Sequence, residues 1–331
     1  MRNQISIAIS GFCSIVAVGT LGANGIAVTS ERLATGAILQ IEGDVAVQRD
    51  DGRSFAPELG TLLYPGDRLQ IASGRAIVQC QDLSVATVTE ADWTNACQSD
   101  PNTSDCSDDA VRCPHRGDEI AASNSATPYI IAPRRTNLLD DRPTLRWNPV
   151  PGATRYTVRL REDGLEIWRG EATSAQIEYP EDAPSLQPGA EYLLVVRSDT
   201  GQLSLEPAIP GGFGFRILDT ELAERVRWKR GEIEVKPWNS TAKTLAIARL
   251  YQRYGLISEA VAMLENTIEN GVESAALYGY LGQLYWDYLA LESLAIDRYC
   301  QALKLANPED LELREAAIDR VGDRCSAVSE N

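Results

Sequence analysis

The stretch IARLYQRYGLISEAVAML, at residues 247–264, decides the fold of the C-terminal part of this chain. Its Ala, Leu and Tyr residues recur every three or four positions, which is the spacing of an amphipathic α-helix. The pair Leu250-Tyr251 returns as Leu284-Tyr285, which is 34 residues further along the chain. A recurrence at this distance indicates a repeated helical hairpin. We therefore predict an array of stacked helices in this part of the chain.

Each of the two units resembles a tetratricopeptide repeat (TPR), a helix–turn–helix unit of about this length. The residues that carry the resemblance are Ile247, Ala248, Tyr251, Gly255, Ala260 and Leu264 in the first unit, and Tyr278, Leu281, Gly282, Tyr285, Ala295, Tyr299 and Ala302 in the second. The small residues among them imply that paired helices approach closely. The second unit has one extra residue between its helices, and Thr244 stands where a bulky residue is usual. The resemblance implies two repeats plus a capping helix within residues 241–327.

A concave face formed by the first helix of each hairpin is implied by the same resemblance, and TPR proteins use this face to hold peptides. In the family register the face includes Leu245, Arg249, Gln252, Arg253, Gly279, Gln283, Trp286 and Asp287. Arg249 and Arg253 stand one helical turn apart, so they are candidate anchors for a carboxylate or an acidic partner segment. The alternative is that two repeats only dock on a neighbouring domain.

Residues 36–94 show short apolar alternations separated by turn residues, which predicts strands joined by tight turns. The elements GDV at residues 43–45 and LYPGDRL at 63–69 resemble those of a FecR-like domain. FecR-family regulators carry a cytoplasmic, sigma-factor-binding segment before a membrane span, but only Met1 to Gln4 precede the apolar run here. We therefore expect a β-rich adhesion or interaction module and not the siderophore-signalling role of that family.

Residues 128–217 alternate apolar and polar residues with turns about every ten positions, which predicts a β-sandwich. The element LQPGAEY, at 186–192, resembles the fibronectin type III signature Leu-x-Pro-Gly-x-x-Tyr. The resemblance implies that the hydroxyl of Tyr192 ties a corner of the fold and that Trp147 is the core tryptophan of an early strand. Residues 219–237 are polar and charged, and we expect a short helix there that acts as a spacer.

The N-terminus carries a targeting signal, in which Arg2 precedes an apolar run from Ile5 to Leu21. Small residues then follow, including Gly25 and Ala27. This pattern predicts a secretory signal peptide at residues 1–27, with an uncleaved membrane anchor as the alternative. We expect an exported protein of the periplasm or cell envelope, and secretion is possible.

Cysteine usage agrees with export, because removal of Cys13 with the signal leaves an even number. The mature cysteines are Cys80, Cys97, Cys106, Cys113, Cys300 and Cys325. In an oxidising compartment these thiols would pair. The connectivity is open, although closeness along the chain favours Cys80 with Cys97, Cys106 with Cys113, and Cys300 with Cys325. Residues 95–127 form a polar, Cys- and Asp-rich loop or linker that we expect to be irregular and stapled by disulfides.

The charge and the histidine count argue against several function classes. A formal net charge of -16 disfavours nucleic acid, because phosphate binding needs clustered Lys and Arg. The chain has 1 histidine, His115, so triad and multi-histidine metal schemes lack their parts. Cys97, Cys106, Cys113 and His115 could supply four zinc ligands, but their spacing is wider than that of usual zinc motifs. We predict no catalytic residues, metal or cofactor.

The sequence as a whole predicts a multidomain protein, with an all-β FecR-like domain and a β-sandwich followed by an α-helical TPR-like hairpin array. We expect a non-catalytic cell-envelope protein that acts as a protein–protein interaction or adhesion scaffold. Its partner would be a protein or peptide, with no nucleic acid, and with a membrane only through the N-terminal segment if that is uncleaved. The alternatives are an envelope signal sensor acting through the FecR-like module and a cell-wall-directed enzyme.

Overall fold

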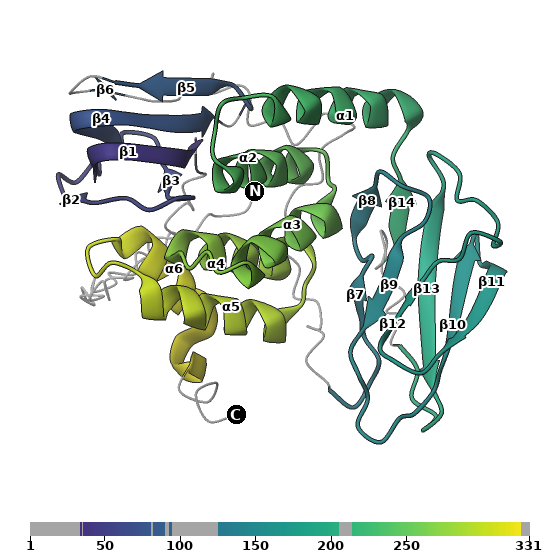
Figure 1. Cartoon of the computed structure of the whole chain (residues 1–331). Coiled ribbons are helices and arrows are strands. Elements are labelled where there is room, and N and C mark those ends of the chain that lie inside the picture. Colours follow the sequence, from purple (N-terminus) through teal and green to yellow (C-terminus); the bar gives the residue numbers. More distant parts are fainter. Residues whose placement is uncertain are drawn as a thin grey trace, which may run out of the picture. The chain divides into compact units, whose positions relative to one another are not determined.

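The computed structural model describes residues 34, 36–80, 82–89, 93–94, 125–204 and 214–325. These belong to one compact unit, Leu33–Asn331. The predicted signal peptide, most of the Cys- and Asp-rich loop, and the cysteines Cys97, Cys106 and Cys113 lie outside the described residues. Strands occupy the first part of the described chain and helices the last part, so the predicted order of β and then α structure is confirmed (Figure 1).

The first sheet is built on a long antiparallel pair, β1 (Gly36–Gln48) and β4 (Arg68–Cys80). Four short strands pair with it: β2 (Ser54–Phe55), β3 (Leu62–Leu63), β5 (Val85–Val88) and β6 (Trp93–Thr94). Gly43 of β1 lies opposite Gly74 of β4, and both have positive φ, at 89° and 88°. A Cβ at either position would collide with a backbone carbonyl of the opposite strand. Glycine is therefore required where the two strands meet.

The β1–β4 pair buries apolar side chains on both of its faces. Ile38 and Val78 belong to a small core of the sheet itself. Leu39 and Ile77 belong to the core that the helices form. Because neighbouring strand residues point to opposite faces, this alternation places the sheet directly against the helical region. The side chain of Gln79 adds a polar contact, donating a hydrogen bond of 3.3 Å from Nε2 to the carbonyl of Ala246.

Two sheets make up the β-sandwich in the middle of the chain. The larger has the order β11-β10-β13-β14-β8, and the smaller has the order β12-β9-β7. Their strands are β7 (Ile130–Ala132), β8 (Thr136–Leu138), β9 (Thr144–Trp147), β10 (Tyr156–Glu162), β11 (Leu165–Ala172), β12 (Gln176–Glu178), β13 (Glu191–Ser198) and β14 (Phe215–Ile217). The pair β8–β14 is parallel and the other pairs are antiparallel.

The core of the sandwich contains both aromatic residues that the sequence singled out. Trp147 is 1% exposed and contacts Tyr156 edge to face, with the ring centroids 5.3 Å apart. The hydroxyl of Tyr192 accepts a hydrogen bond of 2.8 Å from the backbone N–H of Gln187. This bond closes the corner that precedes β13, as the LQPGAEY element predicted. A tyrosine that is apolar on one side and hydrogen-bonded at its tip suits such a position.

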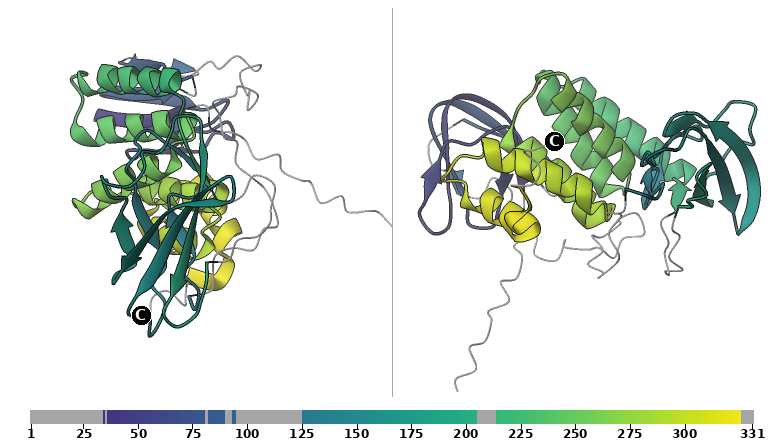
Figure 2. Two further views of the ribbon diagram at one scale, coloured as in Figure 1. Left: turned by 90° about the vertical axis from the view of Figure 1, so that its right-hand side faces the viewer. Right: turned by 90° about the horizontal axis from the view of Figure 1, so that it is seen from below.

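The helical region contains six α-helices and two short helical turns among the described residues. They are α1 (Thr220–Glu234), α2 (Ser240–Arg253), α3 (Ile257–Glu269), α4 (Ala275–Gln283), the π-helical turn η1 (Leu284–Tyr288), α5 (Glu292–Leu305), α6 (Leu311–Val321) and the 3₁₀ turn η2 (Gly322–Arg324). The hairpins α2–α3 and α4–α5 lie side by side (Figures 1 and 2). The expected helix at 219–237 is α1, and its Val226 is buried in the same core, so this helix packs on the array and does not separate it from the sandwich.

Close packing between the paired helices depends on small residues, as the sequence indicated. A Cβ added at Gly282 of α4 would lie 3.0 Å from the ring of Tyr299 on α5. Ala260 of α3 and Ala295 of α5 are each 0% exposed. A larger side chain at these positions would push the helices apart.

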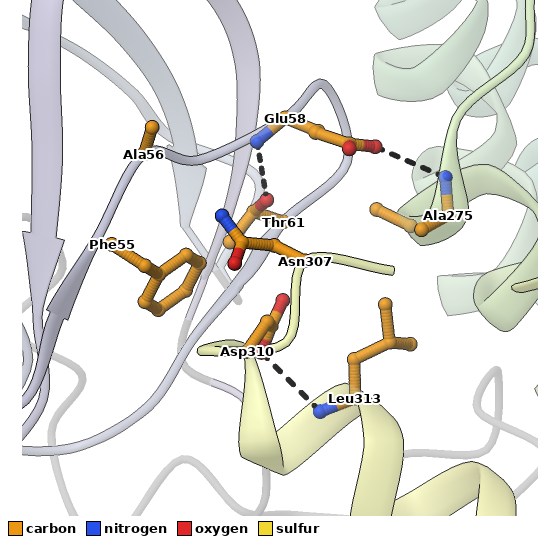
Figure 3. A pocket seen from close by; sticks show the side chains of 9 residues that line it. Phe55, Ala56, Glu58, Thr61, Ala275, Asn307, Asp310 and Leu313 are labelled. Carbon is orange, nitrogen blue, oxygen red and sulfur yellow. Dashed lines mark hydrogen bonds between the residues drawn. The ribbon is translucent and has the colours of Figure 1, made fainter. Parts of the chain in front are cut away.

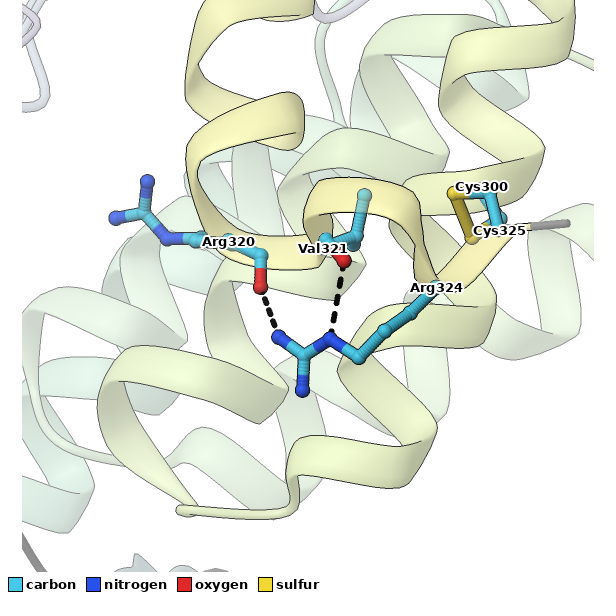
Figure 4. Close-up of a disulfide and its surroundings, with 5 residues drawn as sticks. All are labelled: Cys300, Arg320, Val321, Arg324 and Cys325. Carbon is cyan, nitrogen blue, oxygen red and sulfur yellow. Dashed lines mark hydrogen bonds between the residues drawn. A yellow bond between two sulfur atoms is a disulfide. The ribbon is translucent and has the colours of Figure 1, made fainter. Parts of the chain in front are cut away.

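The last helix, α6, is held at both ends. At its C-terminal end a disulfide joins Cys325 to Cys300 of α5, which confirms the predicted pairing (Figure 4). Arg324 supports the same turn by donating a 3.0 Å hydrogen bond from Nε to the carbonyl of Val321. At the N-terminal end, the Asp310 carboxylate accepts a hydrogen bond of 3.3 Å from the N–H of Leu313. Cys80 is also disulfide-bonded.

Candidate partner-binding site

Leu245 was predicted on the partner-binding face, but its side chain is 1% exposed and belongs to the core of the helices. The loop before β3 lies against it, since a Cβ at Gly60 would be 3.7 Å from Leu245 Cδ2. Sheet and helices therefore enclose Leu245 between them. The prediction for this residue is wrong, because the helical pattern shows that the side chain is apolar but not which domain covers it.

Three other residues of the predicted face are in contact with the capping segment. A Cβ at Gly279 would overlap Leu313 of α6. The carboxylate of Asp287 pairs with Arg320 at 3.4 Å. The guanidinium of Arg324 lies 5.7 Å from the ring centroid of Trp286. The contacts at these three positions hold α6 and η2 in place.

A polar cluster remains between α2 and the second hairpin. Gln252 of α2 joins two tyrosines, because its Oε1 accepts a 2.6 Å hydrogen bond from the hydroxyl of Tyr280. Its Nε2 donates a 3.0 Å hydrogen bond to the hydroxyl oxygen of Tyr288. Arg249 stands one turn before Gln252 and influences the pKa of both tyrosines. We call these four residues, Arg249, Gln252, Tyr280 and Tyr288, the Arg249 cluster.

The π turn η1 positions Tyr288 in this cluster. The N–H of Leu289 donates to the carbonyl of Leu284 at 3.1 Å, which is a bond across five residues. The turn therefore absorbs the extra residue that the sequence showed in the second repeat unit. Such turns are frequent at functional sites, since they rotate one side chain away from its regular helical position. Sequence reasoning missed Tyr280 and Tyr288, and the extra residue was the signal that could have led to the second.

Arg249 has no counter-ion among the described residues. It makes no hydrogen bond or ion pair with any of them, and its Nε is buried without a partner. Burial lowers its pKa, and the groups that oppose this effect are Tyr280 and Tyr288, not a carboxylate. Burial raises the pKa of both tyrosines, so their hydroxyls stay protonated at neutral pH. The cluster therefore combines neutral hydrogen-bonding groups with a cation that has no counter-ion among the described residues.

Arg253 and Gln283 complete the account of the predicted residues. Both side chains are half-buried. Arg253 lies one turn after Arg249, in the last turn of α2. Gln283 is the last residue of α4, directly before the π turn. They flank the Arg249 cluster on its two helices.

A second group of charges lies where the first sheet contacts α6. Arg49 is 4% exposed, and its guanidinium is 2.5 Å from Asp67, 3.3 Å from Asp310 and 3.1 Å from Glu312. Burial opposes its charge, but these carboxylates outweigh that effect and raise its pKa. The rings of Phe55 and Tyr64 flank the guanidinium, with centroids 5.0 and 5.1 Å away. This group, the Arg49 cluster, already has its counter-ions and functions as a structural junction.

A small pocket opens next to this junction (Figure 3). It has room for about 10 Å³, which corresponds to roughly one water molecule. Glu58 on its rim accepts a 3.0 Å hydrogen bond from the N–H of Ala275, at the start of α4. Asp310 on the opposite side caps α6. The pocket is therefore a gap in the contact between sheet and helices, and it is too small for a substrate.

The described residues contain no group of three or more His, Cys, Asp and Glu side chains that could hold a metal ion. His115 and the cysteines of the hypothetical zinc site lie outside them. Within the same part of the chain, no helix has the length and apolar character needed to cross a membrane.

Comparison with known proteins gives weak likenesses. No protein-family model matches the chain, and no curated protein matches it. The fibronectin(III)-like modules of CbhA from Clostridium thermocellum are similar at 13% identity and a TM-score of 0.21, over 59% of this chain and 84% of that one. A beta-1,2-glucanase from Parabacteroides distasonis is similar at 9% identity and a TM-score of 0.21, over 87% of this chain. The match spans 49% of the glucanase, about half its length.

Proposed function

We propose that the chain is a non-catalytic, exported cell-envelope protein whose helical region binds a protein or peptide partner. The observation that carries this proposal is the Arg249 cluster, in which a half-buried cation with no counter-ion among the described residues lies near polar groups of two neighbouring hairpins. A cation in such a position is costly for the fold on its own, which points to a role outside folding.

The contacts between the helical region and the two β domains support the proposal of a scaffold. The helical region is tied to the first sheet through a shared core, and to the sandwich through polar contacts. Asn137 of β8 donates a 3.0 Å hydrogen bond to the carbonyl of Tyr254 at the end of α2. As part of this proposal, we interpret the paired helices as TPR-like hairpins and the first sheet as a FecR-like module. Under this proposal the β domains hold the array rigid while its surface contacts the partner.

Site-specific photo-crosslinking tests the proposal. A photoreactive residue at Gln283, beside the cluster, is compared with one at Leu203, which is 44% exposed in the sandwich. In cells that express the full chain, we expect a single crosslinked partner from position 283 and none from 203. The identity of that partner also separates a scaffold, which binds a structural neighbour, from a sensor, which binds a transporter or kinase. Crosslinks of equal yield from both positions would contradict the assignment of the surface.

Export is tested on the same material. Mass spectrometry of the N-terminus should show a mature chain that begins after Ala27, recovered from the envelope fraction. Recovery of the intact chain from the cytosol would overturn the proposed location.

A further inference from the structure

The helix α1 carries an apolar strip on the side that faces solvent. Its opposite side packs beside α2 through Ala223 and Val226, which belong to the core of the helices (Figure 1). Trp228 and Val235 lie away from that core and are 65% and 79% exposed. They stand seven positions apart, so two helical turns bring them to one face. Large apolar side chains that share an exposed face mark a contact site for another protein surface.

Gly231 lies between these two residues of the strip. A Cβ added at Gly231 would meet no heavy atom within 4 Å, whereas one added at Gly282 would lie 3.0 Å from the ring of Tyr299. Glycine weakens the interior of a helix relative to alanine. Packing within the described chain therefore explains the glycine at 282 but not the one at 231. Gly231 leaves open space one turn after Trp228.

The charged residues on one flank of the strip are arranged symmetrically around its tryptophan. Glu221 and Arg225 precede Trp228 by seven and three positions, and Glu232 and Lys236 follow it by four and eight. All four side chains are exposed. About a midpoint directly after Trp228, Glu221 is as far away as Lys236, and Arg225 is as far away as Glu232. Each of these two pairs combines opposite charges.

We propose that α1 binds α1 of a second copy of this chain, in an antiparallel contact with two-fold symmetry centred at Trp228. In such a contact, one flank of a helix faces the same flank of the other helix in reverse order. Glu221 then meets Lys236 of the partner subunit, and Arg225 meets Glu232 of the partner subunit. Symmetry forms each pair twice. This inference goes beyond the proposed function and does not depend on it.

The ion pairs of the single chain leave these charges available. Glu221 and Arg225 pair with each other at 2.9 Å, but both are exposed, so solvent screens the pair. Glu232 and Lys236 make no ion pair with the described residues. A second copy supplies counter-ions for all four in one arrangement. An unrelated helix would match this order of charges only by coincidence, so the pattern favours a second copy as the occupant of the strip.

The apolar residues fit the same antiparallel arrangement. A helical side chain leans toward the N-terminus of its own helix. In an antiparallel pair, this direction carries the ring of Trp228 toward the residues that follow Trp228 of the partner subunit. That is the place where Gly231 leaves open space, so the ring can approach the backbone closely. A contact along one helix is smaller than that of a permanent dimer, and we expect monomer and dimer to exchange in solution.

Sedimentation equilibrium of the full chain over a range of concentrations tests the proposal. Trp228→Ala should weaken dimerisation by about tenfold or more, because a central tryptophan carries a large share of binding energy. Gly231→Leu should also weaken it, because the new side chain fills the space for the ring. Leucine is a better helix former than glycine, so this variant keeps α1 intact.

Leu165→Ala is the matched control, because Leu165 is 73% exposed at the start of β11 in the sandwich. It should leave dimerisation unchanged. A wild type that is monomeric at every concentration would overturn the proposal. Equal dimerisation of Trp228→Ala and the wild type would overturn it as well.

Charge exchange tests the direction of the helix pair. Arg225→Glu and Glu232→Arg each place like charges opposite each other twice, so each alone should weaken dimerisation by roughly threefold to tenfold. The double variant restores opposite charges and should dimerise like the wild type. A mixture of the two single variants should form a heterodimer, which excludes misfolding as the cause of their losses. A double variant that dimerises no better than the single variants would refute the antiparallel contact.

Discussion

Arg49 is buried and Arg249 is half-buried, and among the described residues only Arg49 has counter-ions. Arg49 lies among Asp67, Asp310 and Glu312, which come from a strand-connecting loop and from the capping segment. For Arg249, the described groups that oppose the effect of burial on its pKa are the hydroxyls of Tyr280 and Tyr288. A buried cation with several carboxylates stabilises one arrangement of domains, whereas a cation without them costs stability. The comparison separates a junction of the fold from a cation that the described part of the chain leaves without a counter-ion.

The largest effect is expected at the junction. Arg49→Met leaves Asp67 and Asp310 without their cation and leaves Glu312 with Arg53 alone, so the free energy of unfolding at pH 7 should fall by about 3–5 kcal/mol. Urea-induced unfolding measures this loss. Arg75→Met is the control, because Arg75 pairs with Glu42 at 2.8 Å on the surface, where solvent screens the pair and its loss should cost far less. Equal costs for the two variants would show that the Arg49 cluster is not a junction.

The disulfide at the other end of α6 should have the next largest effect. Its removal in the double variant Cys300→Ala, Cys325→Ala should lower the free energy of unfolding by about 3 kcal/mol, because the unfolded chain gains freedom. Both this bond and the Arg49 cluster hold α6. The loss in the combined variant should therefore differ from the sum of the two losses by more than about 0.5 kcal/mol. Strict additivity would contradict a shared role in fixing α6.

Glu259 is the acidic counterpart of Arg249, because it too has no counter-ion in the part of the chain that the structure describes. Its Oε1 accepts a 3.0 Å hydrogen bond from the N–H of Leu139, and its Oε2 is buried without a partner. Burial raises the pKa of Glu259 to about 7, with a smaller contribution from Asp140. The folded state thus holds a proton that the unfolded state has lost between pH 4.5 and about 7. Stability should fall as the pH rises through this window.

Glu259→Gln removes this pH dependence while it keeps an acceptor for Leu139. Relative to the wild type, the variant should gain roughly 2 kcal/mol between pH 5 and pH 8, after allowance for the partial exposure of the side chain. Thermal unfolding over this pH range measures the gain. The exposed Glu178 provides the control variant, Glu178→Gln, which should follow the wild-type curve. If the difference in stability between Glu259→Gln and the wild type did not change with pH, this would contradict a raised pKa at Glu259.

The smallest effect on stability is expected at Arg249. Arg249→Met should raise the free energy of unfolding by up to about 1 kcal/mol, because it removes a half-buried cation that has no counter-ion among the described residues. The same urea experiment as for Arg49 measures it. A loss as large as that of Arg49→Met would show that a carboxylate of the chain itself pairs with Arg249.

The sequence was most informative where one local pattern determines the structure. The LQPGAEY element predicted the bond between Gln187 and Tyr192, and closeness along the chain predicted the pair Cys300–Cys325. Helical spacing predicted small residues such as Gly282 where two helices meet. These features depend on residues within about one hairpin of each other, so the local pattern was sufficient.

Features that depend on distant residues were not predictable in this way. Leu245 was placed on a free surface because its helix gives no sign of the loop around Gly60 that covers it. The Arg49 cluster brings together positions that no motif connects. The position of Tyr288 depends on the π turn η1. The sequence showed that the second repeat unit has one extra residue, but not that this residue forms a π turn. Arg249 was found as a candidate, whereas its missing counter-ion could be seen only once the surrounding side chains were placed.

The junction at Arg49 also sets an order of events during synthesis. Arg49 and Asp310 are separated by 261 residues, so the first sheet emerges long before the helix that completes its charge balance. Until then, Arg49 has Asp67 as its nearest counter-ion and the face around Leu39 has no helices to pack against. Contacts between such distant segments form slowly. The packing of the N-terminal sheet can therefore be completed only after the end of the chain has been synthesised. A chaperone that shields the sheet until then would increase the yield of folded protein.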